Sequence, residues 1–410
     1  MMIRRADGYL AVITISVLLV AEPVHAALSF DFSEVYTVQG DPFSGQEEEN
    51  PLIMAPRINN VGEIVFREAL FNQSGQMTSD EIFFRDVNGA LTIVADMSQY
   101  PGGFNGSPSI SDDSRAWFLA GDIGHRQPQL LVASGSQVDV FIDSKNPNDA
   151  INFIFGVQVS PTGVVSLLGS DADDLGLESV LYKTTNGSDI EELARSPGEL
   201  VSIGGISPAN AQGQVAFHAF DQSLAQGIYV ADGLAINTIS KQNAEYFTIT
   251  DINDAGIVAF YQHPANYDPI TSGIYLSDGL TQWQVVDATN GGINGFDLNN
   301  ANQVAYSAGI TSNFGGTLYL ADSAGTHRII GLSDPLAGSY VTGAALLPGG
   351  FNDAGQIAFV ASLADGRHGI FLADPNLPEN NGPIVPEPSS LILLGSGLFG
   401  LIGFTRRKQV

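Results

Sequence analysis

One short stretch constrains the fold of this chain more than any other. Asn253–Phe260 reads Asn-Asp-Ala-Gly-Ile-Val-Ala-Phe, two turn-forming positions followed by an apolar run. Asn tolerates a left-handed backbone and Gly carries no Cβ, so together they favour a tight reversal. The apolar residues that follow are typical of a buried strand. The stretch therefore predicts a turn that leads directly into a core β-strand.

The same pattern recurs along the chain at an average spacing of about 49 residues. Two of the copies are degenerate, with Ser114 in place of the Gly in one, and Ser160 and Leu167 in place of the Asn and Phe in the other. Such a period lies in the range of a propeller blade. The copies are Asn59–Phe66, Ser111–Phe118, Ser160–Leu167, Asn210–Phe217, Asn253–Phe260, Asn299–Tyr306 and Asn352–Phe359. The residues assigned to the repeated turn are Asn59, Gly62, Asn210, Gly213, Asn253, Gly256, Asn299, Asn352 and Gly355.

A second strand and a tight hairpin follow each of the first six copies. Asn-Gly and Asp-Gly pairs between apolar runs are strong hairpin signals. A third strand follows the hairpin, as at 91–94 and 284–286. The hairpin positions are Asn88-Gly89, Ser134-Gly135, Asn186-Gly187, Asp232-Gly233, Asp278-Gly279 and Gly325. Each unit is thus expected to contain at least three strands, which makes the fold class all-β.

The last unit is incomplete, because it reaches 370–374 and then meets Pro375 without a third strand. The N-terminal stretch Glu34–Val38 could supply the missing strand. An incomplete last repeat completed by the first strand is how a propeller ring closes and protects its edges. Residues 27–374 are therefore predicted to form a seven-bladed β-propeller-like repeat array. The alternative, a β-solenoid or another all-β array, would leave open ends that need caps, and no cap segment is evident.

The composition excludes several classes of function. The chain has 44 acidic and 16 basic residues, a formal net charge of −28, and such a surface repels nucleic acid and anionic lipid. It has no cysteine, which excludes disulfides, thiolate zinc sites and cysteine nucleophiles. The acidity favours solubility outside the cell over a dedicated cation-binding role.

The N-terminus is typical of a secretory signal peptide, assigned to residues 1–26. Arg4 and Arg5 precede an apolar run at 9–21, and small residues precede a cleavage site between Ala26 and Ala27. The run is 13 residues long, too short to span a bilayer. Signal peptidase is therefore an expected partner.

The C-terminus combines three features in a fixed order. A Pro-rich linker at 375–384 precedes Pro386-Glu387-Pro388, an apolar run at 391–404 and the basic end Arg406, Arg407 and Lys408. Segment 385–410 closely resembles the PEP-CTERM sorting signal. That resemblance implies a hydrophobic helix held in the inner membrane by its basic stop, cleavage by exosortase near Pro386–Pro388, and a Gram-negative host.

The repeats between residues 30 and 375 resemble the Asn-x-x-Gly-x-x-Ala-Phe tandem-repeat proteins, whose members carry a choice of C-terminal anchors. Ser114, Ser160 and Leu167 depart from that pattern. The resemblance implies no agreed activity.

No catalytic signature appears in the sequence, and no cofactor is predicted. One stretch invites a calcium site, with candidate ligands Asp171, Asp173, Asp174 and Glu178, although Leu175 stands where another oxygen ligand is expected. Asp251 and Asp254 form a similar group, but the repeated turn already explains them. His125, His218, His263, His327 and His368 are scattered over five units and share no register.

The aromatic residues are expected to lie in the core. Trp117 and Trp283 could stack on sugar, but tryptophans of a propeller are more often buried. The recurrent Phe of the repeat is expected to pack between blades, at Phe66, Phe118, Phe217, Phe260 and Phe359.

These features predict an exported, surface-sorted, non-enzymatic protein that acts as a binding or structural component of the cell envelope or of an exopolysaccharide matrix. The alternative is a polysaccharide-active hydrolase or lyase with its site at the propeller mouth. Under that alternative, the loops at 99–108 and 261–272 are the places to search. A cleft with carboxylates in contrasting environments would favour the enzyme, and a shallow face lined by Tyr and Asn would favour the binder.

Overall fold

The computed structural model describes residues 28–39, 49–121, 128–144, 151–171, 178–233, 235–242, 245–264, 272–289, 291–311 and 315–376. Every regular element in these ranges is a β-strand. No helix long and apolar enough to cross a membrane occurs among them. Residues 29–376 form one compact unit. The expected signal peptide, sorting segment and hydrophobic helix at 391–404 lie outside the described residues.

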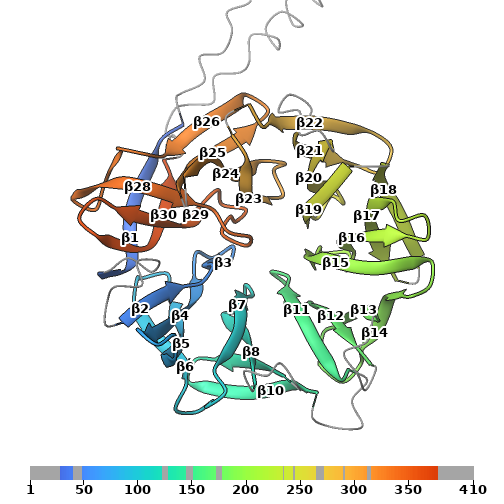
Figure 1. Ribbon diagram of the computed structural model, residues 1–410, viewed down its shortest axis with the longest axis horizontal. Helices are drawn as coiled ribbons and strands as arrows, with labels where there is room; N and C mark the ends of the chain where they lie inside the picture. Colours follow the sequence, from blue (N-terminus) through green and yellow to red (C-terminus); the bar gives the residue numbers. More distant parts are fainter. Residues whose placement is uncertain are drawn as a thin grey trace, which may run out of the picture. The chain divides into compact units, whose positions relative to one another are not determined.

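The strands form antiparallel sheets that follow one another around a common centre (Figure 1). The first contains β2 (Glu49–Ile53), β3 (Arg57–Ile58), β4 (Ile64–Asn72), β5 (Met77–Arg85) and β6 (Leu91–Asp96). The second contains β7 (Phe104–Ile110), β8 (Arg115–Ala120), β9 (Gln129–Ser134) and β10 (Gln137–Asp143). The third contains β11 (Phe153–Val159), β12 (Val165–Ser170), β13 (Ser179–Thr184) and β14 (Glu191–Ser196).

Two further four-stranded sheets continue the series. One contains β15 (Leu200–Ala209), β16 (Val215–Asp221), β17 (Gln226–Asp232) and β18 (Ala235–Gln242). The next contains β19 (Glu245–Ile252), β20 (Val258–Pro264), β21 (Gly273–Ser277) and β22 (Gln282–Asp287). In each of these sheets neighbouring strands are consecutive in sequence, as expected for repeated meanders.

The remaining strands belong to one nine-stranded sheet that has two parts. The first part contains β23 (Ile293–Leu298), β24 (Val304–Thr311), β25 (Gly315–Asp322) and β26 (Gly325–Ile330). The second contains β27 (Pro335–Leu336), β28 (Ser339–Ala345), β29 (Ile357–Leu363), β30 (Arg367–Pro375) and β1 (Phe30–Gln39). The two parts are joined through a single residue pair, Gly316 with Ala344.

The N-terminal strand pairs with the last strand of the chain. β1 runs antiparallel to β30, from Phe30 opposite Pro375 to Gln39 opposite Arg367. The strand is longer than the expected stretch 34–38, and it supplies the strand that the incomplete last unit lacked. The Asn376 N–H donates to the Ser29 carbonyl at 2.8 Å, so the two ends of the described body leave it side by side.

The seven repeat copies adopt one turn geometry. The first residue of each turn donates its N–H to the carbonyl four residues later, at 2.9–3.2 Å, and its carbonyl accepts the N–H three residues later, at 2.8–3.1 Å. The fourth residue has a positive φ in every copy, including Ser114 (64°) and Asn302 (59°) where Gly is absent. The φ at Gly256 is 77°, in the left-handed region that favours glycine. The two copies without Gly at this position, those with Ser114 and Asn302, therefore keep the turn at some cost in backbone strain.

Side chains of these turns connect successive copies. Asn amides donate across to a backbone carbonyl of the next copy, and one of them connects the last copy to the first, Asn352 Nδ2 to Asn59 O at 2.8 Å. A second series of hydrogen bonds joins the second residue of a turn to the second residue of the turn in the next copy. One of them closes the series, because the Asp353 N–H donates to Asn60 Oδ1 at 2.9 Å. The other amide donations run from Asn59 to Ser111, from Asn210 to Asn253 and from Asn253 to Asn299. The second series is interrupted at the third copy, because Pro161 has no N–H to donate.

Replacing Asn253 should test this role of the turn. Its Oδ1 accepts the N–H groups of Ala255 and Ile257, and its Nδ2 donates to Asn299 O and Asn302 Oδ1. The side chain is buried, so Asn253→Ala should lower the free energy of unfolding by about 2–3 kcal/mol, because it leaves these backbone groups without partners. Chemical denaturation measures the loss, with the exposed hairpin change Asn88→Ala as control. A loss no larger than that of the control would contradict the role.

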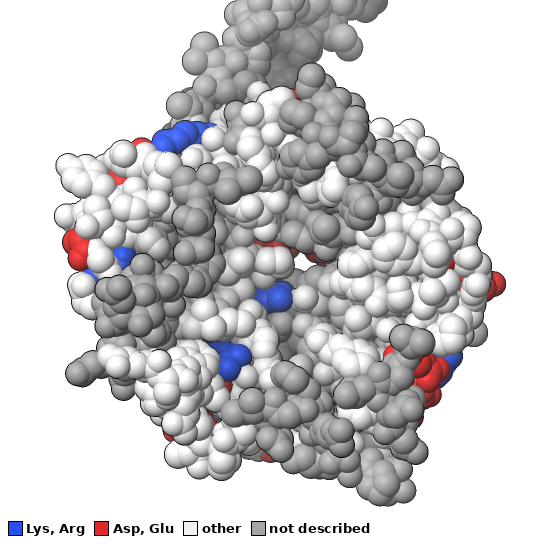
Figure 2. Space-filling model, viewed as in Figure 1, with Lys and Arg blue, Asp and Glu red and all other residues white. Residues whose placement is uncertain are grey.

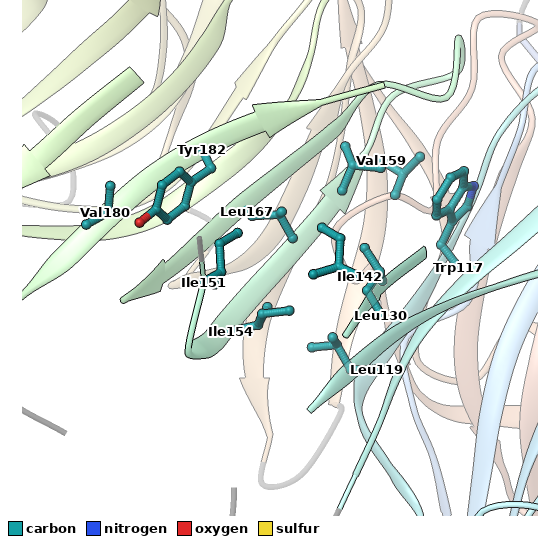
Figure 3. Packing of buried hydrophobic residues seen from close by; sticks show 11 residues of the cluster. Trp117, Leu119, Leu130, Ile142, Ile151, Ile154, Val159, Leu167, Val180 and Tyr182 are labelled. Carbon is teal, nitrogen blue, oxygen red and sulfur yellow. The ribbon is translucent and has the colours of Figure 1, made fainter. Parts of the chain in front are cut away.

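The core lies between neighbouring sheets. Figure 3 shows one cluster, in which Trp117 and Leu130 of the second sheet face Val159, Leu167 and other residues of the third. The five recurrent Phe residues at 66, 118, 217, 260 and 359 are all buried, as predicted. Trp117 is also buried and its Nε1 donates to Ser111 Oγ, which removes it as a surface for sugar. Trp283 on β22 is 39% exposed.

Candidate functional site

A cavity of about 300 Å³ lies where the inner strands and the repeated turns converge. It is lined by residues from the ends of β3, β7, β11, β15, β19 and β23, by the segment 348–351, and by Asn and Asp residues of the turns. Figure 2 shows a hollow near the centre of one face, with Lys or Arg atoms and Asp or Glu atoms at its edge. This cavity is the candidate functional site.

The position two residues before each turn determines the chemistry of the cavity. In chain order this position holds Arg57, Ser109, Gln158, Pro208, Asp251, Asp297 and Gly350. Five of the seven, all except Ser109 and Gly350, line the cavity. The position immediately before the turn is apolar in every copy and also lines it, with Ile58, Ile110, Val159, Ala209, Ile252, Leu298 and Phe351. The wall therefore combines apolar side chains with a few varied polar ones.

Arg57 on β3 provides the positive charge of the lining. Its Nη1 donates to Gln158 Oε1 on β11 at 2.7 Å. Its Nε is buried and has no hydrogen-bond partner among the described residues. Burial lowers the pKa of Arg57, and the nearby Asp297 and Asp251 carboxylates partly offset that effect. The Nε–H is therefore a buried donor without an acceptor among these residues, which is rare in folded proteins.

Gly349 lets the Arg57 side chain take this place. The Arg57 guanidinium and its stem lie so close to the Gly349 Cα that any side chain there would collide with them. Gly349 also has a φ of 89°, which L-residues with side chains rarely adopt. A glycine is therefore needed at this position for both space and backbone conformation.

Two carboxylates, Asp251 on β19 and Asp297 on β23, face the same cavity. Asp297 accepts the N–H groups of Gly349 and Gly350, both at 2.8 Å, and Asp251 accepts those of Ile252 and Leu298. Burial raises the pKa of Asp251 to about 6, against the lowering effect of its backbone N–H donors and Arg57. Burial and the charge of Asp251 raise the pKa of Asp297 well above its usual range. Both side chains thus hold neighbouring strands together while their negative charge is disfavoured.

The stability of the protein should therefore increase as the pH falls from 7.5 to 5. A carboxyl whose pKa is higher in the folded than in the unfolded state binds its proton more tightly on folding, so its contribution opposes folding above that pKa. For Asp251, whose pKa rises from 3.8 to about 6 on folding, the gain between pH 7.5 and 5 amounts to about 1.4 kcal/mol. Asp297 acts in the same direction. Thermal denaturation at the two pH values measures the effect.

The Asp251→Asn variant serves as its control, because it removes one of the two titrating groups. The variant should show a smaller difference in melting temperature between pH 5 and pH 7.5 than the unmodified protein. Protonation of the many other acidic residues at low pH weakens their mutual repulsion equally in both proteins. An equal difference in the two proteins would show that these carboxyls do not cause it.

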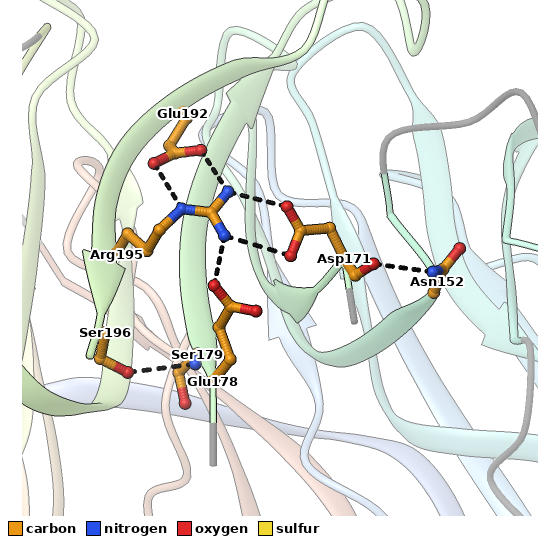
Figure 4. A network of polar contacts seen from close by, with 7 residues as sticks. All are labelled: Asn152, Asp171, Glu178, Ser179, Glu192, Arg195 and Ser196. Atoms are coloured by element: carbon orange, nitrogen blue, oxygen red, sulfur yellow. Dashed lines mark hydrogen bonds and ion pairs between the residues drawn. The ribbon is translucent and has the colours of Figure 1, made fainter. Parts of the chain in front are cut away.

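The two calcium candidates that the structure describes, Asp171 and Glu178, form ion pairs with an arginine. The Arg195 guanidinium donates to Asp171, Glu178 and Glu192, and its two bonds to Asp171 are 2.8 and 3.1 Å long (Figure 4). These bonds from Arg195 lower the pKa of Asp171. Asp173 and Asp174 lie outside the described residues. Within the described ranges no group of three or more His, Asp or Glu side chains is placed to hold a metal ion.

Calcium binding at 171–178 stays a prediction. A rise in melting temperature on adding calcium, lost in the double variant Asp171→Ala/Asp173→Ala, would support it. A rise that persists in the double variant would contradict it.

The other sequence-predicted residues divide into two groups. Of the turn residues, Asn59, Asn210, Asn253 and Asn352 line the cavity, whereas Asn299, Gly62, Gly213, Gly256 and Gly355 do not. The processing residues Ala26, Ala27 and Pro386–Pro388 and the basic stop Arg406–Lys408 lie outside the described residues. Sequence reasoning missed Arg57, Gln158 and Asp297, and assigned Asp251 only to the turn. The signal that could have found them is their shared register, two residues before each turn.

Comparisons of sequence identify the sorting segment. The PEP-CTERM protein-sorting motif matches residues 385–408. A family of unknown function (DUF7453) matches residues 334–391. Among curated proteins, none matches the sequence significantly. The motif means that the protein is exported, passes through the membrane to the cell surface and is processed by exosortase. Neither match covers the repeats as a whole, so the likeness to the tandem-repeat proteins stays a prediction.

Comparisons of structure identify the type of fold. The acylaminoacyl peptidase of Pyrococcus horikoshii is 14% identical with a TM-score of 0.55, over 82% of this chain and 53% of the peptidase. A puromycin-hydrolyzing peptidase of Mycobacterium tuberculosis is 12% identical with a TM-score of 0.51, over 82% and 53%. A prolyl endopeptidase is 10% identical with a TM-score of 0.51, over 80% and 50%. The chain spans about half the length of each peptidase, and at these identities the likeness shows a β-propeller-like fold alone.

Proposed function

We propose that this exported, surface-sorted protein is a non-enzymatic binding component of the cell envelope or of an extracellular polysaccharide matrix. The observation that carries the proposal is the central cavity, in which Arg57, Gln158, Asp251 and Asp297 alternate with apolar side chains. Planar polar groups next to apolar surface are suited to sugars, whose hydroxyl edges form hydrogen bonds and whose C–H faces pack on apolar walls. Delivery to the surface brings such a cavity to extracellular polysaccharide.

The body is proposed to be a seven-bladed propeller closed by β1. Three features support closure: β1 pairs with β30, Asn352 donates to Asn59 O, and Asp353 donates to Asn60. In this proposal the single residue pair between β25 and β28 connects two separate blades. Closure places one strand end from every blade around the cavity.

The two ends of the chain are proposed to act in export. Signal peptidase cleaves between Ala26 and Ala27, and exosortase cleaves near Pro386–Pro388. Until the second cleavage, the run at 391–404 forms a hydrophobic helix in the inner membrane of a Gram-negative bacterium, with Arg406–Lys408 as its stop.

The second candidate is a polysaccharide hydrolase or lyase that uses the two carboxyls of the cavity. The raised pKa of Asp251 and Asp297 favours it, because a general acid must keep its proton near neutral pH. Against it, each of their four carboxylate oxygens already accepts a backbone N–H. Those bonds fix the carboxyls as supports of the strands and limit their access to a substrate.

A binding assay with a parallel release assay tests the proposal. Purified residues 27–384 are incubated with extracellular polysaccharide from a producing bacterium and with a glycan array, while reducing ends released into solution are measured. Retention of the protein without release is the expected result. Release of sugar that Asp251→Asn abolishes would establish the enzyme instead, and no retention on any glycan would overturn the binding role.

A further inference from the structure

The charge of the cavity restricts the class of saccharide that it can hold. The ionisable residues of its lining are one cation, Arg57, and four acids, Asp251, Asp254, Asp297 and Asp353, so the carboxylates outnumber the cation even when the buried Asp297 holds its proton. The rest of the protein is also strongly acidic. A uronate, sulfate or phosphate group would meet a net negative field in a partly desolvated space, where like charges repel strongly. Acidic sugars are therefore disfavoured.

A free cation is disfavoured as well, because no three His, Asp or Glu side chains in the described ranges are placed to hold a metal ion. Backbone N–H groups donate to both oxygens of Asp297 and both oxygens of Asp251. At the rim, the Asn300 amide donates to Asp254 at 2.7 Å and to Asp353 at 2.9 Å. Each oxygen keeps a further lone pair that can accept from a hydroxyl group.

A neutral ligand rich in hydroxyl groups matches the hydrogen-bonding groups and the apolar surface of the cavity. A hydroxyl group can accept from the Arg57 guanidinium, which lines the cavity, and can donate to the carboxylates. The partly buried apolar residues of the lining, such as Ile206, Pro208 and Pro348, offer surface for the C–H face of a sugar ring. At about 300 Å³ the cavity is at the small end of ligand sites, which suits one or two sugar units.

We infer that the cavity binds a neutral, hydroxyl-rich saccharide end and that Arg57 and Gln158 hold it. Arg57 donates to ring or hydroxyl oxygens, while Gln158 fixes the guanidinium through its 2.7 Å hydrogen bond. The inference rests on the proposed binding function, and it adds the charge class and the size of the ligand.

Titration calorimetry with defined sugars tests the inference. Residues 27–384 are titrated with neutral di- to tetrasaccharides of glucose, galactose and mannose, and with the same sugars carrying a terminal uronic acid. Neutral sugars should bind at least about tenfold more tightly than their acidic counterparts. Gln158→Ala and Arg57→Gln should each weaken binding by about tenfold or more, whereas Trp283→Ala on the outer strand β22 should change it by less than about twofold.

Each other outcome counts against the inference. Equal or tighter binding of the acidic sugars, or a loss of binding in Trp283→Ala with none in Gln158→Ala, overturns it. If Arg57→Gln does not fold, as judged by its melting transition, Gln158→Ala alone decides the site. Retention on native polysaccharide without binding of any neutral sugar overturns the inference and leaves the proposed function standing, and failure of both assays removes both.

Discussion

A chain that begins at residue 41 should fail to form a stable body, although it loses only one strand, β1. β1 pairs with β30 along nine residue positions, and its Val35, Tyr36 and Val38 pack against the core cluster that includes Phe66, Phe83 and Ile370. The Tyr36 ring lies 5.2 Å from each of the Phe66 and Phe83 rings, between centroids. Loss of this packing and an exposed β30 edge should together cost more than about 5 kcal/mol of unfolding free energy.

Chemical denaturation of residues 41–384 against residues 27–384 measures this cost. A synthetic peptide of residues 28–40 added to the shorter chain should restore a cooperative transition, and a scrambled peptide of the same composition should not. Equal denaturation midpoints for the two chains would show that β1 is not part of the stable body.

Arg67→Met should lower the free energy of unfolding by about 3–5 kcal/mol. Arg67 on β4 forms a bidentate ion pair with Asp80 on β5, with Nε–Oδ1 and Nη2–Oδ2 distances of 2.6 and 2.9 Å. Asp80 has no exposed surface, and it also accepts the Phe104 N–H from the second sheet. Removing the arginine would leave a buried carboxylate without its counter-charge, at the place where two sheets meet.

The exposed ion pair of Arg328 and Asp334 gives a matched control. Arg328→Met breaks a pair of similar length, 2.7 Å, whose arginine side chain is 47% exposed, and should cost no more than about 1 kcal/mol. The double variant Arg67→Met/Asp80→Leu should recover part of the loss, because it removes the unpaired charge. Similar losses in Arg67→Met and Arg328→Met would contradict the role assigned to burial.

The fold could be predicted from the sequence because the same signals for a turn and a strand recur in each repeat. A position that needs a left-handed backbone, followed by an apolar run, recurs often enough to define strands, hairpins and a sheet series. The pattern also tolerates exceptions, since Ser114 and Asn302 adopt the same left-handed conformation as the glycines. The pairing of β1 with β30 could be anticipated because the last unit lacked a strand.

The site could not be predicted in the same way, because its residues differ from copy to copy. Arg57, Gln158, Asp251 and Asp297 share a register but no residue type, and only the convergence of the inner strands brings them to one cavity. The ion pairs of the calcium candidates with Arg195 could not be predicted for a related reason. Arg195 is 24 residues from Asp171, and an ion pair over that separation leaves no local pattern.

The measurement that tests the account most directly is a crystal structure of residues 27–384 grown with the saccharide that binds most tightly. The account predicts a sugar unit in the central cavity, with an oxygen within hydrogen-bond distance of the Arg57 guanidinium and a C–H face against Ile206, Pro208 or Pro348. A saccharide bound elsewhere, for example on Trp283 and the outer strand β22, with an empty central cavity, would contradict it.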